Sequence, residues 1–246
     1  MKRATFRFYE ELNEFLPVER RKVSFIYEFN GNPSVKDAIE ALGVPHVEVD
    51  LVLVNGVSVG FSQRLNEGDN VSVYPVFEGL DITPLLRLRA KPLREVKFIL
   101  DVHLGKLARY LRICGFDTLF SNQYDDPEIV DRAEKERRII LTRDRNLLKN
   151  SRVTHGHWIR SQKPVEQLKE VLMRLDLKGQ VRLFTRCSIC NTPVEDVNKA
   201  DIESRLDLGT RRYYSTFWRC LGCGRIYWGG SHYTNMIRVI QQVIGG

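Results

Sequence analysis

The sequence of 246 residues lacks any apolar run near the roughly 20 residues that a membrane-spanning helix needs. Its first residues, Met1 to Phe6, lack the apolar stretch of a secretory signal peptide. Internal repeats and low-complexity tracts are also missing. These absences argue against membrane, secreted and repeat proteins, and we expect a cytoplasmic protein with ordinary buried cores, since 43% of the residues are hydrophobic.

Cysteine is scarce, and the count of five is odd, which argues against a disulfide scaffold. Four of the five form two C-x-x-C pairs, Cys187 with Cys190 and Cys220 with Cys223. Each such turn points two thiolates at one ion, and two turns complete a tetrahedron. We therefore predict a structural zinc site, with a redox pair or an iron–sulfur cluster as alternatives. The fifth cysteine, Cys114, is interpreted as a small core residue.

Positive charge is confined to the later part of the chain. Residues 1–80 hold 8 Lys/Arg and 12 Asp/Glu, so 8 − 12 = −4. Residues 81–246 hold 30 Lys/Arg and 19 Asp/Glu, so 30 − 19 = +11. A basic domain attracts polyanions such as nucleic acid, although a charge that only keeps the protein soluble is the alternative.

The first segment has the pattern of a small sheet with one helix. Aromatic and β-branched residues predict strands at 4–9, 23–29, 49–54 and 71–77. A helix is predicted between Ser34, a suitable N-cap, and Gly43, with Val35, Ala38, Ile39 and Leu42 on its apolar face. The dipeptide Asn55-Gly56 predicts a hairpin turn.

This order resembles the ubiquitin-like β-grasp fold, and the run from Val71 to Gly79 is similar to the end of sulfur-carrier proteins. Sulfur carriers need a free Gly-Gly terminus, whereas here Gly79 is followed by Leu80 and the chain continues. The terminal Gly245-Gly246 pair lies in another domain. We therefore expect a docking or folding module that has lost the sulfur chemistry.

Strands and helices alternate from Val96 onward, which predicts an α/β domain with a parallel sheet. Strands are expected at 96–101, 117–121, 138–144 and 153–159, and helices at 104–114, 127–137 and 165–175. On the first of these helices Leu104, Leu107, Ala108 and Leu111 form the apolar face, and Lys106, Arg109 and Arg112 are expected off it.

Aspartates follow two of these strands. Asp101 and Asp144 would share the carboxyl edge of a parallel sheet, where ligands bind in open α/β folds, and Asp125 or Asp126 could reach it. Clustered carboxylates suit Mg²⁺ or Mn²⁺, which activate water for attack on a phosphodiester. Helix capping is the alternative for Asp101, for Asp144 and for Asp126, which precedes Pro127. Asp117 is a possible further acid or only the start of a strand.

Three segments carry a resemblance to a known family. They are Leu104–Arg112, Gly115–Thr118 and Arg138–Asp144, and they closely resemble the Mut-seven C-terminal RNase family. The resemblance implies a PIN-like α/β/α nuclease domain, a zinc ribbon after it and a ubiquitin-like domain in front. It also implies catalytic, metal-binding roles for Asp101, Asp126 and Asp144, with Asp125 as the rival of Asp126 and Asp125 or Asp117 as a possible fourth acid.

Basic residues flank the expected acidic site. Lys106, Arg109, Arg143 and Arg145 are candidates for phosphate contacts. Between the cysteine pairs, Arg211 and Arg212 alternate with aromatic residues, a mixture that suits single-stranded or structured RNA. Solvated surface charge is the alternative for each of them.

The sequence thus predicts an α/β multidomain protein. Its parts are a ubiquitin-like β-grasp domain at 1–80, a linker at 81–95, a PIN-like domain at 96–180 and a zinc-ribbon domain at 181–246. The expected function is a ribonuclease dependent on Mg²⁺ or Mn²⁺. The alternative is a non-catalytic adaptor that binds RNA or the ribosome. The first domain could hold a protein partner.

Overall fold

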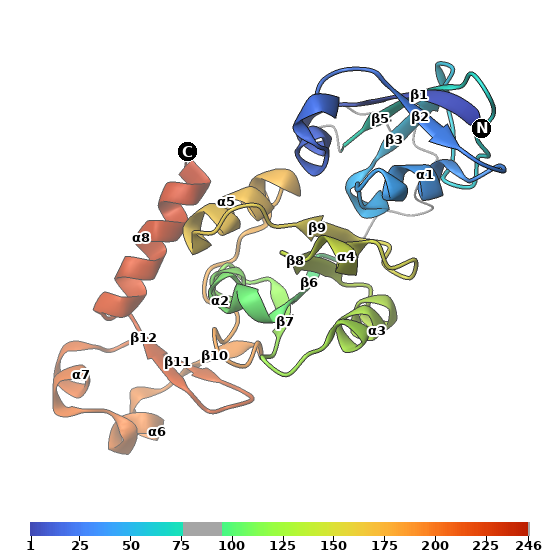
Figure 1. Cartoon of the computed structure of the whole chain (residues 1–246). Helices are drawn as coiled ribbons and strands as arrows, with labels where there is room; N and C mark the ends of the chain where they lie inside the picture. The colour runs from blue at the N-terminus through green and yellow to red at the C-terminus, as the bar shows by residue number, and fades with distance from the viewer. Residues whose placement is uncertain (76–94, 246) are drawn as a thin grey trace. The chain divides into compact units, whose positions relative to one another are not determined.

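The computed structural model describes residues 1–75 and 95–245, and these fall into two compact units (Figure 1). One comprises Met1–Glu95 with Asp144–Trp158, and the other comprises Val96–Arg143 with Ile159–Gly246. Except for Glu95, the predicted linker at 81–95 lies outside the described residues, as does the end of the run up to Gly79. The predicted domain boundaries stay predictions.

None of the helices in the described ranges has both the length and the apolar character needed to cross a membrane.

A five-stranded mixed sheet forms the body of the first unit, in the order β2-β1-β5-β3-β4. Its strands are β1 (Lys2–Phe8), β2 (Phe25–Phe29), β3 (Leu51–Val54), β4 (Val57–Ser58) and β5 (Asn70–Tyr74). Only the β1–β5 pair is parallel. Helix α1 (Val35–Ala41) buries its apolar side in the same core as Phe6 and Phe8. This is the β-grasp arrangement that the sequence predicts.

Two local signals in this unit are confirmed. Ser34 caps α1 by accepting a hydrogen bond from Asp37 N at 3.1 Å, while the Asp37 carboxylate accepts one from Ser34 N. These hydrogen bonds lower the pKa of Asp37 below its ordinary value. Asn55 and Gly56 both have positive φ, 52° and 80°, as the tight turn between β3 and β4 requires.

The segment 144–158 belongs to the first unit, although the sequence assigns it to the second domain. It carries α4 (Arg145–Leu148) and β9 (Gly156–Trp158). The buried carboxylate of Glu48 accepts a hydrogen bond from Trp158 N at 2.5 Å. His46 Nε2 lies 2.8 Å from the Val153 carbonyl oxygen. These buried polar contacts tie the segment to the short 3-10 turn at His46–Glu48.

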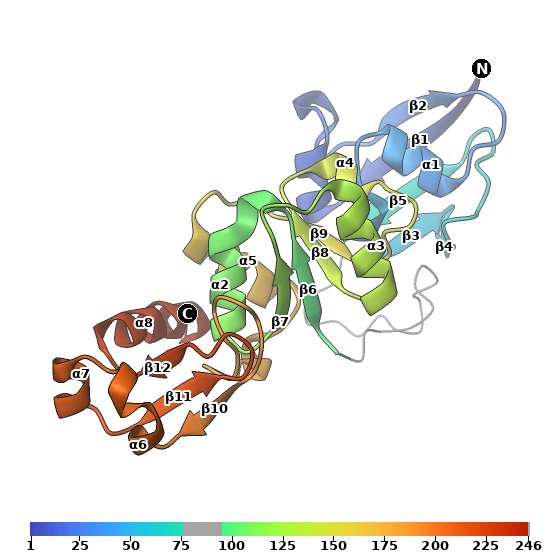
Figure 2. The same ribbon diagram turned by 90° about the horizontal axis from the view of Figure 1, so that it is seen from below.

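The second unit contains three parallel strands in the order β7-β6-β8. They are β6 (Lys97–Leu100), β7 (Asp117–Phe120) and β8 (Ile139–Thr142), joined through α2 (Gly105–Ile113) and α3 (Asp126–Glu136). The chain crosses from β6 to β7 in one direction and from β7 to β8 in the other. Right-handed crossovers therefore put α2 and α3 on opposite faces of the sheet, as Figure 2 shows.

The core of this unit lies between the strands and the helices. Its buried side chains include Ile99 of β6, Ile140 of β8, and Leu107 and Leu111 of α2. Helix α5 (Pro164–Arg174) packs beside α2. Each fully buried leucine contributes about 1.5–3 kcal/mol relative to an exposed one, so these layers hold the α/β part together without help from a ligand.

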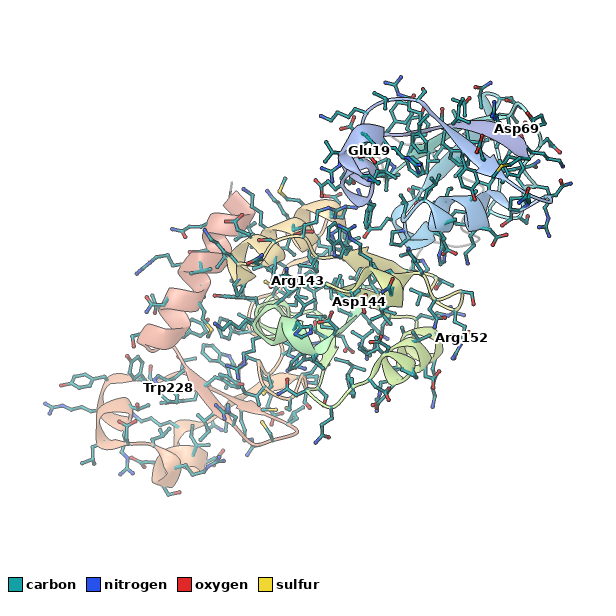
Figure 3. The ribbon with its side chains drawn as sticks, in the orientation of Figure 1. Glu19, Asp69, Arg143, Asp144, Arg152 and Trp228 are labelled. Carbon is teal, nitrogen blue, oxygen red and sulfur yellow. The ribbon has the colours of Figure 1, made fainter. Side chains whose placement is uncertain are left out.

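A smaller antiparallel sheet follows, in the order β10-β11-β12. Its elements are β10 (Val194–Val197), α6 (Lys199–Ile202), α7 (Leu208–Tyr213), β11 (Phe217–Cys220) and β12 (Ile226–Trp228), followed by α8 (Ser231–Gly245). Its buried core consists of Ile202, Leu206 and Phe217, with residues such as Trp228 packed against it (Figure 3). Such a core is small for a region of this length, which points to a further source of stability.

Gly115 is the position where the backbone most needs glycine. It ends α2 with φ of +95°, and a Cβ atom there would overlap the Arg182 carbonyl oxygen and lie 2.8 Å from Thr185 Oγ1. We expect Gly115→Ala to lower the free energy of unfolding by roughly 2–4 kcal/mol. Denaturant unfolding measures this, with Gly179→Ala as the control because a Cβ there meets nothing within 4 Å. Equal losses in the two variants would contradict the assignment.

Candidate functional site

Asp101 is a buried carboxylate at the carboxyl end of β6. One oxygen accepts a hydrogen bond from His103 N at 2.9 Å, and so caps the turn Val102–Leu104. The other accepts from Thr142 Oγ1 at 2.5 Å and from Arg143 N at 2.9 Å. One carboxylate thus fixes both the turn that follows β6 and the backbone of Arg143, just after β8. The capping role considered from the sequence is confirmed, and the carboxylate also joins β6 to the end of β8.

A pocket of about 830 Å³ opens beside Asp101 and is lined by residues of the second unit. Its cationic lining residues are Lys106, Arg109, Arg112 and Arg143, and His103 lines it beside them. Val102, Phe120 and Ile189 supply apolar walls, and none of the described lining residues is an Asp or Glu. Three of the predicted phosphate-binding residues, Lys106, Arg109 and Arg143, are therefore brought together. A concave surface with this charge is suited to a polyanion.

The other predicted acids take different places. Asp125, not Asp126, is the N-cap of α3, because its carboxylate accepts a hydrogen bond from Glu128 N at 2.9 Å. The expected capping by Asp126 is therefore wrong, since Asp126 is the first residue of the helix itself. Asp144, shown beside Arg143 in Figure 3, is the N-cap of α4 and accepts from Asn146 N. Both Asp126 and Asp144 are exposed.

Carboxylates do not gather into a group of three among the residues that the structure describes. The group of His, Cys, Asp or Glu side chains whose ligand atoms all lie within 4.8 Å of one another is Cys187, Cys190, Cys220 and Cys223. The acidic metal site formed by Asp101, Asp126 and Asp144 thus stays a prediction.

The four cysteines fit one tetrahedral ion. Cys187 and Cys223 Sγ atoms are 3.7 Å apart, and Cys190 and Cys220 Sγ atoms are 3.3 Å apart, too far for disulfides. Thiolates about 2.3 Å from a zinc ion in tetrahedral geometry are about 3.8 Å from each other. Four sulfurs on a three-stranded sheet are consistent with a zinc ribbon, and the group could hold a metal ion such as zinc.

Hydrogen bonds surround these sulfurs. Backbone N–H groups of Cys190, Gly222 and Cys223 lie 3.4 Å from cysteine sulfurs. The Tyr227 hydroxyl lies 3.0 Å from Cys187 Sγ, and burial raises the pKa of Tyr227. Such partners orient metal-binding thiolates. The contact between Tyr227 and Cys187 could not be predicted from the sequence, because the spacing between these residues matches no known motif.

Two family models match parts of this chain. A family model described as Mut7-C RNAse domain matches residues 96–240, and another described as Mut7-C ubiquitin matches residues 1–81. The chain belongs to the Mut7-C RNAse domain family. No curated protein matches it.

Two solved structures resemble part of this Mut7-C protein. They are SAMP1 from Haloferax volcanii and H. volcanii small archaeal modifier protein 1, with 21% and 20% sequence identity. The matches cover 31% and 30% of this chain and 98% of each of those chains, with a TM-score of 0.25 for both.

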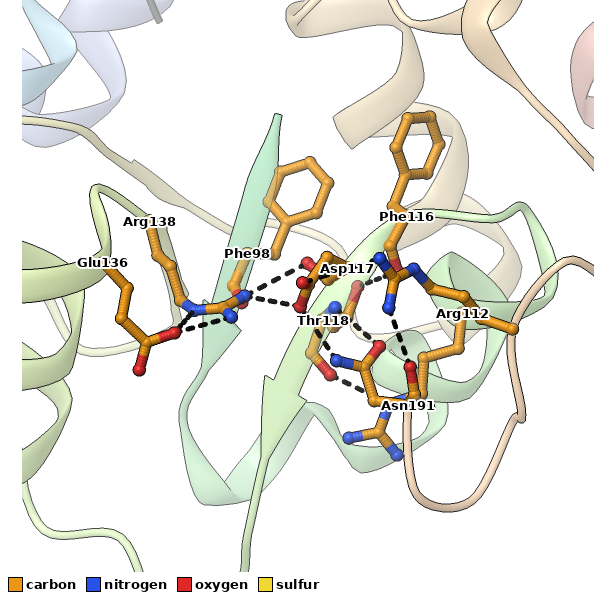
Figure 4. A network of polar contacts seen from close by, with 9 residues as sticks. Phe98, Arg112, Phe116, Asp117, Thr118, Glu136, Arg138 and Asn191 are labelled. Carbon is orange, nitrogen blue, oxygen red and sulfur yellow. Dashed lines mark hydrogen bonds and ion pairs between the residues drawn. The ribbon is translucent and has the colours of Figure 1, made fainter. Parts of the chain in front are cut away.

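Asp117 lies at the amino end of β7, whereas Asp101 follows the carboxyl end of the neighbouring parallel strand β6. Its carboxylate accepts hydrogen bonds from Arg138 at 2.7 Å and Asn191 at 2.8 Å, in the network drawn in Figure 4. Burial acts to raise the pKa of Asp117, but these hydrogen bonds and the charges of Arg138 and Arg186 outweigh it and lower the pKa. Asp117 is therefore a structural anchor at the opposite edge of the sheet.

Arg112 is buried, at 5% exposure, although the sequence pattern put it off the apolar face of α2. Its burial away from that face comes from the first cysteine loop, whose carbonyl oxygens accept hydrogen bonds from the guanidinium. Arg112 Nε donates to the Thr118 carbonyl oxygen at 2.9 Å, and Nη1 donates to the Ile189 carbonyl oxygen at 2.6 Å. Burial lowers the pKa of Arg112, and the nearby Cys187 and Cys190 oppose that shift.

The remaining predicted cations lie outside the pocket lining. Arg145 belongs to the first unit, where its guanidinium lies 3.9 Å from the centre of the Trp158 ring. Arg211 donates to the Glu203 carbonyl oxygen at 2.8 Å, and Arg212 lies over the Tyr213 ring at 5.6 Å. The structure therefore explains Arg145 and Arg211 by local packing, and their RNA contacts stay predictions.

Cysteine reactivity tests the four-cysteine centre. Cys114 is fully buried, and burial raises its pKa to about 12, so it stays a protonated thiol at pH 8. We expect iodoacetamide to leave all five cysteines of the metal-loaded protein largely unmodified. After chelation under native conditions it should modify Cys187, Cys190, Cys220 and Cys223, and spare Cys114. Peptide mass spectrometry measures this, and modification of Cys114 before the other four would contradict the assignment.

Proposed function

We propose that this Mut7-C protein binds RNA in the basic pocket and hydrolyses its phosphodiester bonds. The observation that carries the proposal is the convergence of four Lys and Arg side chains on a pocket next to the buried Asp101. The family whose model covers this part of the chain is described as an RNAse domain. A structural zinc ion at the four cysteines and a cytoplasmic location, where thiols stay reduced, belong to the same proposal.

The pocket lining suits single-stranded RNA. Arg109 and Arg143 can hold phosphates with two parallel hydrogen bonds, and Lys106 adds a point charge. Phe120 and Ile189 offer apolar surface against which an unpaired base can pack. A paired base has its faces covered by its neighbours in the helix, so we propose that unpaired or locally opened regions of RNA are preferred.

Hydrolysis is proposed to depend on Mg²⁺ or Mn²⁺ held by Asp101, Asp126 and Asp144, because carboxylate oxygens suit these ions. The described residues do not by themselves fit such an ion. Asp101 already accepts three hydrogen bonds, and the acids do not come within ligand distance of one another as a group.

The separation of these acids also favours a second candidate, a non-catalytic adaptor that binds RNA or the ribosome through the basic pocket. In either case the ubiquitin-like domain is proposed to hold a protein partner rather than to carry sulfur, since the sequence continues past Gly79 and leaves no free diglycine there.

Lys106 tests RNA binding. Removing one phosphate contact to a single strand lowers the slope of log affinity against log salt concentration by about 0.7. We expect Lys106→Ala to show this change and a severalfold loss of affinity for a labelled single-stranded RNA in fluorescence anisotropy. Lys135→Ala is the matched control, an exposed lysine on α3 that does not line the pocket. Equal effects in the two variants would reduce RNA binding to general surface charge.

Asp101 tests hydrolysis. With a mixed pool of single-stranded and structured RNA, we expect cleavage that needs Mg²⁺ or Mn²⁺ and stops with EDTA. Asp101→Asn should lower its rate by about a hundredfold or more. Asp69→Asn is the control, because it also removes a buried, hydrogen-bonded carboxylate but lies in the first unit.

Asp126→Asn and Asp144→Asn extend the cleavage assay to the proposed metal ligands. Loss of cleavage in either variant would place that acid in the site. An absence of cleavage by the wild-type protein, with RNA binding that still depends on Lys106, would decide for the adaptor.

A further inference from the structure

The first cysteine loop forms part of the wall of the basic pocket. Ile189 lies between Cys187 and Cys190 in the sequence, is 42% exposed, and lines the pocket. The second loop has an apolar residue of similar exposure, Leu221 at 57%, which does not line it. The two C-x-x-C loops are therefore alike as metal ligands but differ in their relation to the pocket.

Arg112 connects this loop to the α/β layer. Its guanidinium bridges the Thr118 carbonyl oxygen of β7 and the Ile189 carbonyl oxygen, with Ser188 O at 3.4 Å. A buried charge is tolerated only where its donors are satisfied. If the loop loses its conformation, Arg112 loses its acceptors there, and a cationic wall of the pocket loses its fixed position.

Asn191 fastens the same loop a second time. Its side chain donates to Asp117 at 2.8 Å and accepts from Thr118 N at 2.9 Å, while its own backbone has φ of 70°. Asn191 follows Cys190 directly, so the metal ligand and the anchor to β7 cannot move independently. Figure 4 shows both attachments, from Arg112 and from Asn191, meeting at the start of β7.

We propose that a metal ion held by the four cysteines organises the RNA-binding pocket, and that Arg112 is the positioning residue that connects the two. The inference rests on the proposed RNA binding at this pocket. Without the ion nothing joins the four sulfurs, and the loop with Ile189 keeps only its attachments through Arg112 and Asn191. Because coupling between two binding sites is reciprocal, RNA must also hold the ion more tightly.

The test compares two charge insertions in the full chain. Ile189→Glu and Leu221→Glu each place a carboxylate at an exposed apolar position between cysteine ligands. In the metal-loaded protein we expect Ile189→Glu to weaken binding of a labelled single-stranded RNA by about tenfold, through repulsion of phosphate, and Leu221→Glu to leave it unchanged. Chelation should weaken RNA binding by the wild-type protein about tenfold. After chelation the Ile189→Glu protein should have the same affinity as the metal-free wild type.

Arg112→Lys gives a second, independent arm. It keeps the charge but loses the guanidinium fork, so we expect full zinc content with RNA affinity close to that of metal-free protein. Arg132→Lys is the matched control, an arginine of α3 whose guanidinium makes two hydrogen bonds to Glu128 and does not line the pocket. It should keep the wild-type affinity. Zinc release, followed with a colorimetric chelator, should be slowed by RNA in the wild type and not in Arg112→Lys.

The outcomes separate the two claims. Equal losses for Ile189→Glu and Leu221→Glu, or wild-type binding that ignores the metal, would overturn the coupling while leaving RNA binding in place. An absence of RNA binding by metal-loaded wild type at low salt would overturn the proposed function and this inference together.

Discussion

The four cysteine sulfurs impose the constraint on which the later half of the chain depends. Their Sγ atoms approach to 3.3 and 3.7 Å in pairs, and the sheet that carries them buries only a small apolar core around Phe217. A region with so little buried apolar surface needs a further contribution to fold stably, and a structural metal ion supplies one in domains of this kind. Hydrogen bonds of Arg112 and Asn191 connect the cysteine loop to β7.

The pocket combines an excess of cations with one deeply buried carboxylate. Its four Lys and Arg side chains repel one another, and none of the described lining residues offers a compensating carboxylate. An RNA backbone relieves that repulsion and releases its own counterions on binding. Asp101 contributes by fixing the backbone of His103 and Arg143, two of the residues that line the pocket. The proposed RNA binding therefore draws on side chains that the fold brings together, whereas the proposed hydrolysis would also require the carboxylates to act with a metal ion.

Patterns of short range made most of the fold predictable. The capping residue Ser34, the turn at Asn55-Gly56 and the apolar face with Leu107 and Leu111 act within a few residues, and each was read correctly. The two cysteine pairs were equally clear because a metal site fixes its spacing. The features that the sequence did not predict depend on contacts between segments that are far apart in the chain. Arg112 is covered by a loop nearly eighty residues later (Ile189 is its acceptor across 77 positions), and Arg145 packs with residues of the first unit.

RNA crosslinking tests the central claim most directly, since it reports where the nucleic acid lies without requiring cleavage. A photoreactive single-stranded RNA should crosslink to peptides from α2, the start of α5 and the loop between Cys187 and Cys190, the segments that line the pocket. Crosslinks confined to residues 1–75, or to α3 on the opposite face of the sheet, would contradict the account.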